Sequence, residues 1–413
     1  MSGKKNGSRQ PSSSLHRQTP PPQLRNSFRW HEWSGAVGDL GTLLPLGFAL
    51  VVFNGFPPER LFFLWGLAYV FSGWYYKVPV SIQPLKAMSV IAISMGYSTV
   101  LLSTTAFFYG LLMIVLALTG MIRWMQKWFS PALVRGVQLG IGLILAHKAV
   151  QLVLEKGLLL QRPQADLYVS LGLLAAALGI LGIFQFRKNI PVVLILIALS
   201  VVGVALAGIV PHPQNPDHSP FSLTPPDVSF FWTALVYLMV PQLPLTLGNA
   251  VFAAADACHV FWRQRSHRVN PTRLSWSIGL SNTFIGLLGG FPVCHGAGGI
   301  GAHAQFGAKT GGAAIIMGGI LILVALTPSF SSILFLIPVP LLAAMLMFDS
   351  WRMMTLIQKL GPGREIAVAL VVGLLSFMTK NLSVALVAGF VLERSLHYYA
   401  KRMAIVSQEK NHD

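Results

Sequence analysis

The chain has 413 residues, of which 54% are hydrophobic and only 10% are charged, whereas charged residues make up about 25% of an average soluble domain. This composition excludes an ordinary soluble protein and indicates a membrane protein. A net charge of +17 would suggest a nucleic-acid partner in a soluble protein, but its distribution along this chain indicates a different origin. The two cysteines, Cys258 and Cys294, form no CxxC pair, so no disulfide framework, metal site or cofactor is expected.

The beginning of the chain differs from the rest. Residues 1–33 are basic and rich in Ser, Pro and Gln, and this composition cannot bury enough apolar surface to fold alone, so we predict a disordered cytoplasmic tail there. Beyond it, apolar stretches that approach the roughly 20 residues of a membrane span recur between short connections. They predict about fourteen transmembrane segments, seven in residues 34–210 and seven in residues 229–400. An outside loop over residues 211–228 separates the two sets, and residues 401–413 form a second short cytoplasmic tail.

The basic residues are distributed unevenly across the predicted membrane. With a cytoplasmic amino terminus, 24 of the 30 Lys and Arg residues fall in segments on the inside and four fall in segments on the outside. This bias is the positive-inside signature of a multi-pass membrane protein, so nucleic acid is not expected as a partner. The bias also supports the number of spans, because the loss of one span would invert every later loop. We predict a protein of the cell membrane, plasma or inner, with both termini in the cytoplasm.

An odd number of spans in each half requires that any internal repeat be inverted in the membrane. Two short similarities support such a repeat. LLPLGFAL around Pro45 is similar to QLPLTLGNAV around Pro244. VPVSIQPLKA around Pro79 is similar to FPVCHGAGG around Pro292. The predicted fold class is therefore an all-α integral membrane protein with a 7+7 inverted repeat.

Two repeat-related segments are poor continuous helices. Residues 289–312 are rich in glycine and contain Pro292, and residues 78–86 contain Pro79 and Pro84; interior glycines and prolines both destabilise a helix. An interruption leaves free N–H groups at the start of a half-helix, which at membrane depth must face protein or a water-filled cavity. Two such starts facing each other would present two positive dipole ends to a small anion. The alternative is that the glycines serve close helix packing.

Four segments carry a family resemblance. They are GDLGTLLPL (residues 38–46), VSIQPLKAM (80–88), PQLPLTLGNAV (241–251) and FPVCHGAGGIGAHAQFGAKTGG (291–312). They closely resemble the signature segments of the molybdate transporter family related to the sulfate permeases, and the likeness extends from about residue 35 to about residue 399. The resemblance implies a core domain from spans 1–4 and 8–11 and a gate domain from the other spans. It also implies broken helices at spans 3 and 10, with molybdate held between their ends.

Polar groups beside the two interruptions are the candidate binding residues. Asp39, an acid inside a span, and His295 are the candidates for proton coupling, because ionisable residues within membranes are usually functional. The alternatives are a packing carboxylate paired with Lys86 for Asp39, and a structural histidine for His295. The polar face of span 8 either lines a cavity or bonds another helix. The candidate oxyanion-binding residues are Ser81, Gln83, Lys86, Gln242, Thr246, Asn249, Cys294, His295, Gly296, Ala297 and Gly298.

These features predict a secondary active transporter of a tetrahedral oxyanion, with molybdate as the substrate and tungstate or sulfate as related candidates. Import of a dianion requires work of about 2.3 kcal/mol per charge per 100 mV of membrane potential, so coupling to protons is expected. The alternatives are a transporter or channel for sulfate or another anion, and a nucleobase permease of the same fold. The spans hold no catalytic spacing, so an enzyme is not expected. Besides substrate and bilayer, a second copy in a homodimer is the expected partner.

Overall fold

The computed structural model describes residues 25–159, 167–184, 192–208, 223–327, 334, 336–361 and 363–409. These parts of the chain are almost entirely helical, as the sequence predicts, apart from two short strands that pair with each other. The elements of the first half are α1 (Trp30–Ala36), the 3-10 helix η1 (Val37–Asp39), α2 (Leu40–Asn54), α3 (Pro58–Tyr76), β1 (Gln83–Pro84), α4 (Lys86–Met95), α5 (Thr99–Thr119), α6 (Ile122–Gln126), α7 (Pro131–Lys156), α8 (Leu167–Phe184) and α9 (Val192–Leu206).

The second half follows a similar order of elements. Its first long helical stretch contains Pro241 and Pro244, which remove two backbone donors, and π-helical segments lie on either side of them. The elements are η2 (Val228–Phe230), α10 (Phe231–Thr233), η3 (Ala234–Met239), α11 (Val240–Leu245), η4 (Thr246–Phe252), α12 (Ala253–Trp262), η5 (Arg263–Ser266), α13 (Pro271–Leu287), β2 (Val293–Cys294), α14 (Ala297–Gln305), α15 (Gly312–Ala325), α17 (Val339–Met354), η6 (Thr355–Lys359), α18 (Arg364–Thr379) and α19 (Leu382–Glu409).

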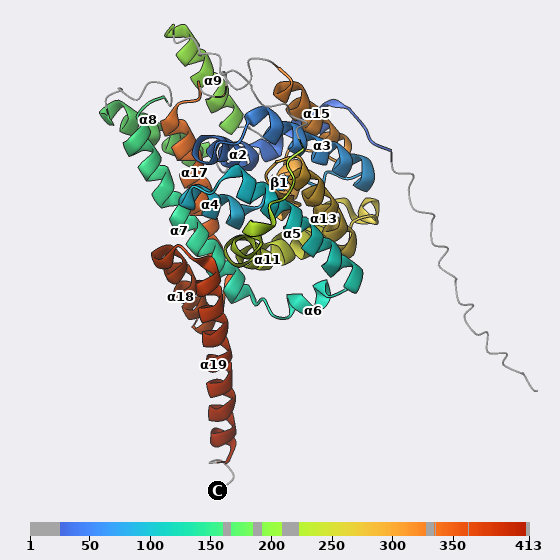
Figure 1. The fold of residues 1–413 in the computed structure, drawn as a ribbon, viewed down its shortest axis with the longest axis vertical. Helices are drawn as coiled ribbons and strands as arrows, with labels where there is room; N and C mark the ends of the chain where they lie inside the picture. Colours follow the sequence, from blue (N-terminus) through green and yellow to red (C-terminus); the bar gives the residue numbers. More distant parts are fainter. Residues whose placement is uncertain are drawn as a thin grey trace, which may run out of the picture.

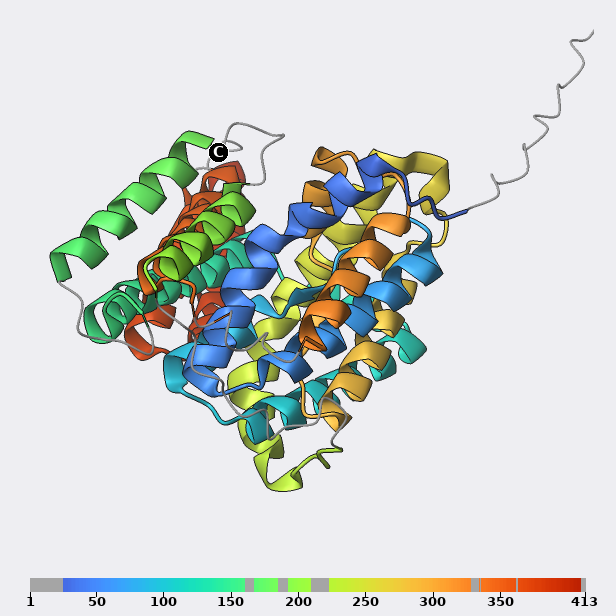
Figure 2. The ribbon, with the colours of Figure 1, turned by 90° about the horizontal axis from the view of Figure 1, so that it is seen from above.

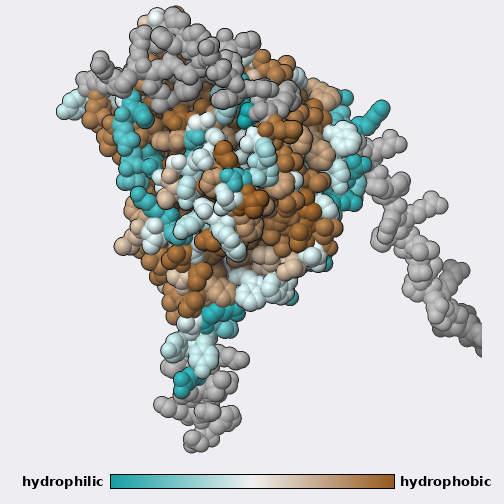
Figure 3. Space-filling model, in the orientation of Figure 1, coloured by the Kyte–Doolittle hydropathy of each residue, from teal (hydrophilic) through white to brown (hydrophobic). Residues whose placement is uncertain are grey.

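Long apolar helices and exposed apolar side chains place the protein in a membrane. Within the described residues, six helices are long and apolar enough to cross a bilayer, and α4, α9 and α15 are shorter apolar helices. Helix α9 buries none of its side chains, and apolar residues cover much of the face drawn in Figure 3. The chain is therefore an integral multi-pass membrane protein. The larger number of about fourteen segments stays a prediction, because short or interrupted helices do not meet a length requirement for spanning.

The helices pack in two groups that lie side by side (Figure 2). In one group α3 packs against α15 and α5 against α13, whereas in the other α7 packs against α17 and α18. Helix α2 contacts α3 of the first group and α17 of the second and so connects the groups. Glycines allow the close approach: a Cβ added at Gly66 would lie 2.8 Å from the Gly318 carbonyl oxygen, and one at Gly279 would lie 3.0 Å from that of Gly110. Small residues commonly form such contacts between membrane helices.

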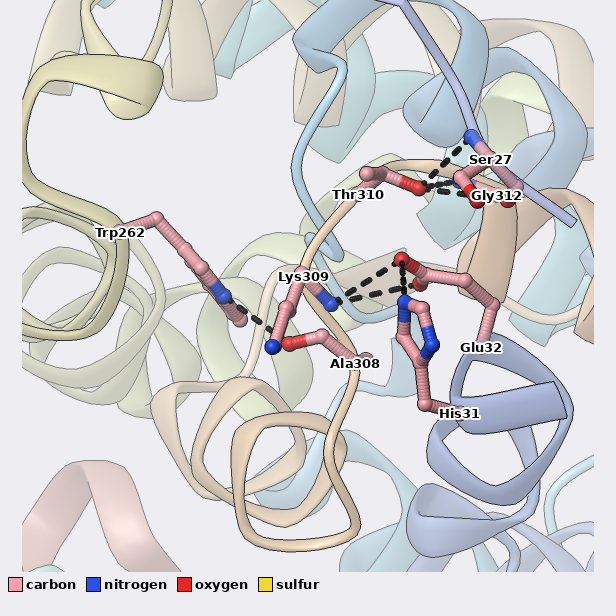
Figure 4. A network of polar contacts seen from close by, with 8 residues as sticks. All are labelled: Ser27, His31, Glu32, Trp262, Ala308, Lys309, Thr310 and Gly312. Carbon is pink, nitrogen blue, oxygen red and sulfur yellow. Dashed lines mark hydrogen bonds and ion pairs between the residues drawn. The ribbon is translucent and has the colours of Figure 1, made fainter. Parts of the chain in front are cut away.

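The segment before η1 is bound to the loop between α14 and α15 (Figure 4). The backbone N–H of Ser27 donates to Oγ1 of Thr310 at 3.1 Å. The backbone N–H of Lys309 donates to both carboxylate oxygens of Glu32, each at 3.3 Å, and the Glu32 side chain is fully buried. On the other side of the loop, Nε1 of Trp262 donates to the Ala308 carbonyl at 3.0 Å. The loop that follows α14 is thus held from two sides.

This attachment tests the boundary of the amino-terminal tail. Helix α1 begins at Trp30, inside the tail predicted over residues 1–33. Composition alone could not place the boundary correctly, because the partner of Glu32 is a backbone group 277 positions later in the chain. At the other end, α19 continues to Glu409 and away from the body of the protein (Figure 1), past the tail boundary predicted at residue 401. Residues 211–222 of the predicted outside loop lie outside the described part of the chain.

Replacing Glu32 with alanine is expected to lower the free energy of unfolding by about 1–3 kcal/mol, because the Lys309 N–H then loses its buried acceptor. The measurement is the apparent melting temperature of the purified protein in detergent. Glu155→Ala is the matched control, since Glu155 lies exposed near the end of α7. Equal melting temperatures for the two variants would contradict a stabilising role for the attachment.

Candidate functional site

The two segments that the sequence predicts to be interrupted meet in an antiparallel pair of strands. β1 pairs with β2 so that Gln83 lies opposite Cys294 and Pro84 opposite Val293. The backbone N–H of Leu85 extends the pairing by donating to the Pro292 carbonyl at 3.1 Å. Prolines disfavour helix at these positions because they lack the N–H donor. Neither segment is a continuous helix, and the two halves of the chain contact each other through extended backbone.

Each strand leads directly into the start of a helix. Helix α4 begins at Lys86 and α14 begins at Ala297, and neither has a side-chain cap for its first N–H groups. In α4, the Met88 N–H donates to Oε1 of Gln242 at 3.2 Å. In α14, the Gly299 N–H bonds back to the carbonyl of Gly296 at 3.1 Å. The remaining N–H groups at a helix start carry partial positive charge and favour an anion.

A cavity of about 340 Å³ lies beside the two helix starts. Its lining residues come from η1, α2, β1, α4, α7, α9, α11, η4, β2, α14, α17 and η6, so it lies where the strand pair and the two helix starts meet α7 and α17. The candidates from the sequence that line it are Gln83, Lys86, Gln242, Asn249, Cys294 and Gly298. The polar residues that line it and were not predicted are Thr42, Arg135, Gln138, Asp349, Arg352 and Lys359.

The charge of the cavity wall is mainly positive. Lys86, Arg135, Arg352 and Lys359 contribute four basic side chains, whereas Asp349 contributes one carboxylate. Nη1 of Arg135 donates to Oε1 of Gln138 at 2.8 Å, which holds that guanidinium at the wall. Among the described residues, no carboxylate forms an ion pair with the Lys86 ammonium within 4.0 Å. A small anion in the cavity would therefore meet at least one ammonium group that is not already neutralised by a contact.

Asp39 lies next to the cavity without lining it. Its side chain is 1% exposed and accepts two hydrogen bonds, one from Oη of Tyr69 at 2.5 Å and one from Nε2 of Gln83. Gly299 of α14 faces the carboxylate closely, since a Cβ there would lie 2.6 Å from both oxygens. Because Gln83 lines the cavity and bonds Asp39, this amide separates the buried acid from the cavity.

Several other candidates are occupied by bonds within the protein. His295 is 2% exposed and lies outside the cavity wall; Nδ1 contacts the Ser81 carbonyl at 3.0 Å and Nε2 contacts Oγ of Ser277. Oγ of Ser81 donates to the Gly296 carbonyl at 2.8 Å, and Oγ1 of Thr246 accepts from Tyr109 and Gln242. These side chains connect the residues next to β1 and β2, and the start of η4, to their neighbours. Besides His295, the candidates that do not line the cavity are Ser81, Thr246, Gly296 and Ala297.

Three of the cavity residues that were not predicted share one feature of the sequence. Arg135, Asp349 and Arg352 are charged residues at positions where the surrounding helix is otherwise apolar. Asp349 and Arg352 are three residues apart, so they lie on one face of α17. Basic residues at the ends of predicted spans are expected on the cytoplasmic side, and this expectation hides a functional role for Arg135 and Arg352. A charged pair three residues apart in an apolar helix could have identified this face.

Most of the elements that build the cavity fall within the part of the chain that matches a known protein family. A family model described as "Molybdate transporter of MFS superfamily" matches residues 31–145 and 234–353. The two matched ranges include the strand pair, both helix starts and the cavity residues of α17. The match therefore covers the elements that build the site.

Two relatives and one solved structure are similar to this chain over most of its length. Molybdate transporter 1 of Arabidopsis thaliana is 25% identical over 357 residues, which cover 77% of each chain. Molybdate transporter 2 of the same organism is 26% identical over 360 residues, which cover 77% of this chain and 76% of that one. In fold, the structure resembles murine Solute Carrier 26 family member A9, an anion transporter in its inward-facing state, with a TM-score of 0.66, 14% identity and coverage of 91% of this chain and 69% of that chain. Since the family model matches more than half of the residues, the chain belongs to the molybdate transporter family.

Proposed function

We propose that this protein is a secondary active transporter of a tetrahedral oxyanion, with molybdate as its substrate and tungstate as a close analogue. The observation that carries the proposal is the cavity beside the starts of α4 and α14, with its four basic side chains. A tetrahedral dianion needs several donors from different directions. Lys86, the free N–H groups at the helix starts and the basic side chains of α7 and α17 supply them.

The movement that we propose is a displacement of one group of helices against the other. The group with α3, α5, α13 and α15 would be the core domain, with β1–α4 and β2–α14 as its two broken spans. The group with α7, α17 and α18 would be the gate domain. The cavity supports this division, because Lys86 and Gly298 line it from the two proposed broken spans, whereas Arg135 and Arg352 line it from α7 and α17. Transport then alternates the side from which the cavity between the groups can be reached.

Coupling to protons follows from the charge of the substrate. A dianion that enters a cell against the membrane potential requires about 2.3 kcal/mol per charge per 100 mV, and each proton that moves with it cancels one charge. Of the two coupling candidates, Asp39 is favoured by its contact with the cavity residue Gln83. Both ring nitrogens of His295 are occupied by contacts within the protein. A location in the cell membrane, cytoplasmic termini and a homodimer are further parts of the proposal.

The test is competitive equilibrium binding to the purified protein. Labelled molybdate is expected to bind and to be displaced by tungstate, whereas xanthine and uracil are expected to leave it bound. Sulfate measures selectivity, because it has the same charge and shape as molybdate but a smaller size.

Two outcomes would favour the alternative functions. Displacement by xanthine or uracil, without displacement by tungstate, would indicate a nucleobase permease. Electrical recordings with currents far above the turnover of a carrier would indicate an anion channel. Absence of binding by all three oxyanions would reject the proposed function itself.

A further inference from the structure

Among the described residues, the side chain of Gln83 links the buried acid Asp39 to the cavity. Its Nε2 donates to Oδ1 of Asp39, and its side chain lines the cavity while being only 1% exposed. Its other polar atom, Oε1, is buried and has no hydrogen-bond partner in the described structure. An amide that places its donors toward Asp39 and its acceptor elsewhere is oriented to serve a carboxylate, not an anion in the cavity.

The orientation of this amide depends on the charge of Asp39. An ionised carboxylate only accepts hydrogen bonds, so the amide NH₂ must face it. A protonated carboxyl has an O–H to donate, and the amide oxygen is the natural acceptor for it. Rotation of the amide by half a turn about its last side-chain bond would then give Oε1 a partner and turn both N–H donors away from Asp39. The energetic reason for the rotation is that a buried polar atom without a partner is costly.

We propose that Gln83 is a positioning residue whose amide turns when Asp39 takes up a proton, so that its N–H donors face the oxyanion only while that proton is held. The inference rests on the proposed proton-coupled transport of an oxyanion. One proton from the aqueous side adds to Oδ1 of Asp39, and the oxyanion then binds to the N–H groups of Gln83 as well as to Lys86. On the opposite side the oxyanion leaves, the proton returns to water, and the amide turns back.

The space around the amide is shaped by a glycine. A Cβ added at Gly296 would lie 2.9 Å from Cδ of Gln83 and would collide with Oε1. Gly296, which was predicted as a binding residue but does not line the cavity, therefore has a different role in this proposal. It leaves the room that the amide needs in order to turn.

Other groups near Asp39 define the competing explanations. His303 of α14 has Nδ1 at 2.7 Å from the Gly35 carbonyl, and its Nε2 is buried without a partner. Asp349 of α17 lines the cavity, and its Oδ2 is likewise buried without a partner. Either group could take up the coupled proton in place of Asp39. The titratable and charged groups that face or act on Asp39 are Tyr69 from α3, Lys86 from α4, Cys294 from β2, His303 from α14 and Asp349 from α17.

The experiment measures binding of sodium molybdate to the full chain in detergent as a function of pH, in a range where the oxyanion stays doubly charged. For the wild type, the dissociation constant is expected to rise with pH, by up to about tenfold per unit once Asp39 ionises, because one proton is bound with the anion. Asp39→Asn is expected to bind tightly with no such slope, since the asparagine NH₂ imitates the protonated acid and donates to Oε1 of Gln83. Gln83→Leu is expected to bind weakly and also without the slope. Asp227→Asn, at an exposed position before η2, is the control and should keep the wild-type slope.

Several outcomes would overturn the switch. The proposed switch fails if molybdate binding by the wild type is independent of pH, and this test needs only the wild-type protein. It also fails if Asp39→Asn keeps the slope, or if His303→Gln or Asp349→Asn removes the slope while Gln83→Leu retains it. In each of these cases molybdate still binds, so the proposed transport of an oxyanion stands, whereas coupling through Asp39 and Gln83 does not. If the wild type binds no oxyanion at any pH, the proposed function fails first.

Discussion

Replacing Lys86 with alanine is expected to weaken molybdate binding by about 100-fold, equivalent to about 3 kcal/mol, because removal of one partner from a desolvated charge pair costs about 2–5 kcal/mol. The ammonium lies at the first position of α4, on the cavity wall, and no described carboxylate pairs with it. Its charge and the partial charge of the helix start therefore act on the same ligand. The dissociation constant, measured by equilibrium binding at one pH and one salt concentration, checks the prediction.

The control for this measurement is Lys156→Ala, because Lys156 is exposed at the end of α7 and far along the chain from the cavity residues of that helix. It should bind molybdate like the wild type. If Lys86→Ala also bound molybdate like the wild type, Lys86 would not be a ligand of the oxyanion. The oxyanion would then have to be assigned to another position. Lys86→Arg adds a second comparison, because arginine keeps the charge but changes the geometry of the donors.

Gly299→Ala is expected to lower the free energy of unfolding by about 3 kcal/mol, because overpacking a tight interior site costs about 1–3 kcal/mol and here the added methyl group also meets a buried carboxylate. The ideal Cβ would lie 2.6 Å from both oxygens of Asp39. To make room, the acid must move away from Tyr69 and Gln83, its two hydrogen-bond donors. Molybdate binding is expected to weaken as well, since Gln83 is displaced from the cavity wall.

Gly301→Ala is the matched control in the same helix. A Cβ at Gly301 would meet nothing within 4 Å, and alanine is favoured over glycine inside a helix by up to about 1 kcal/mol. This variant should therefore be as stable as the wild type or slightly more stable. Apparent melting temperatures in detergent compare the pair, and an equal effect of both substitutions would show that the glycines of α14 matter only for helix propensity.

The interruptions were accessible from the sequence because their cause is local. Pro79, Pro84 and Pro292 cannot donate backbone hydrogen bonds wherever they lie, and clustered glycines disfavour helix in any surrounding. The similarity of the two segments then indicated that they belong together, and Gln83 and Cys294 do lie opposite each other. Local chemistry and an internal similarity were sufficient to predict that neither segment is a continuous helix.

The remainder of the site depends on packing that the sequence does not display. Arg135, Asp349 and Arg352 reach the cavity because α7 and α17 pack against each other and α17 against α2. His295 shows the opposite case: it follows the strand directly, but its ring turns toward Ser277 and the Ser81 carbonyl. Adjacency in sequence therefore indicated a segment that lies beside the cavity, but it did not indicate which way the side chains of that segment point.

The pairing of β1 with β2 has a consequence for how a solute can cross the membrane. Backbone hydrogen bonds fasten one half of the chain to the other at the very place where the two short helices begin. The two helices cannot separate and let an ion pass between them unless these backbone hydrogen bonds break. We therefore expect a solute held there to cross the membrane together with both helix starts and not between them.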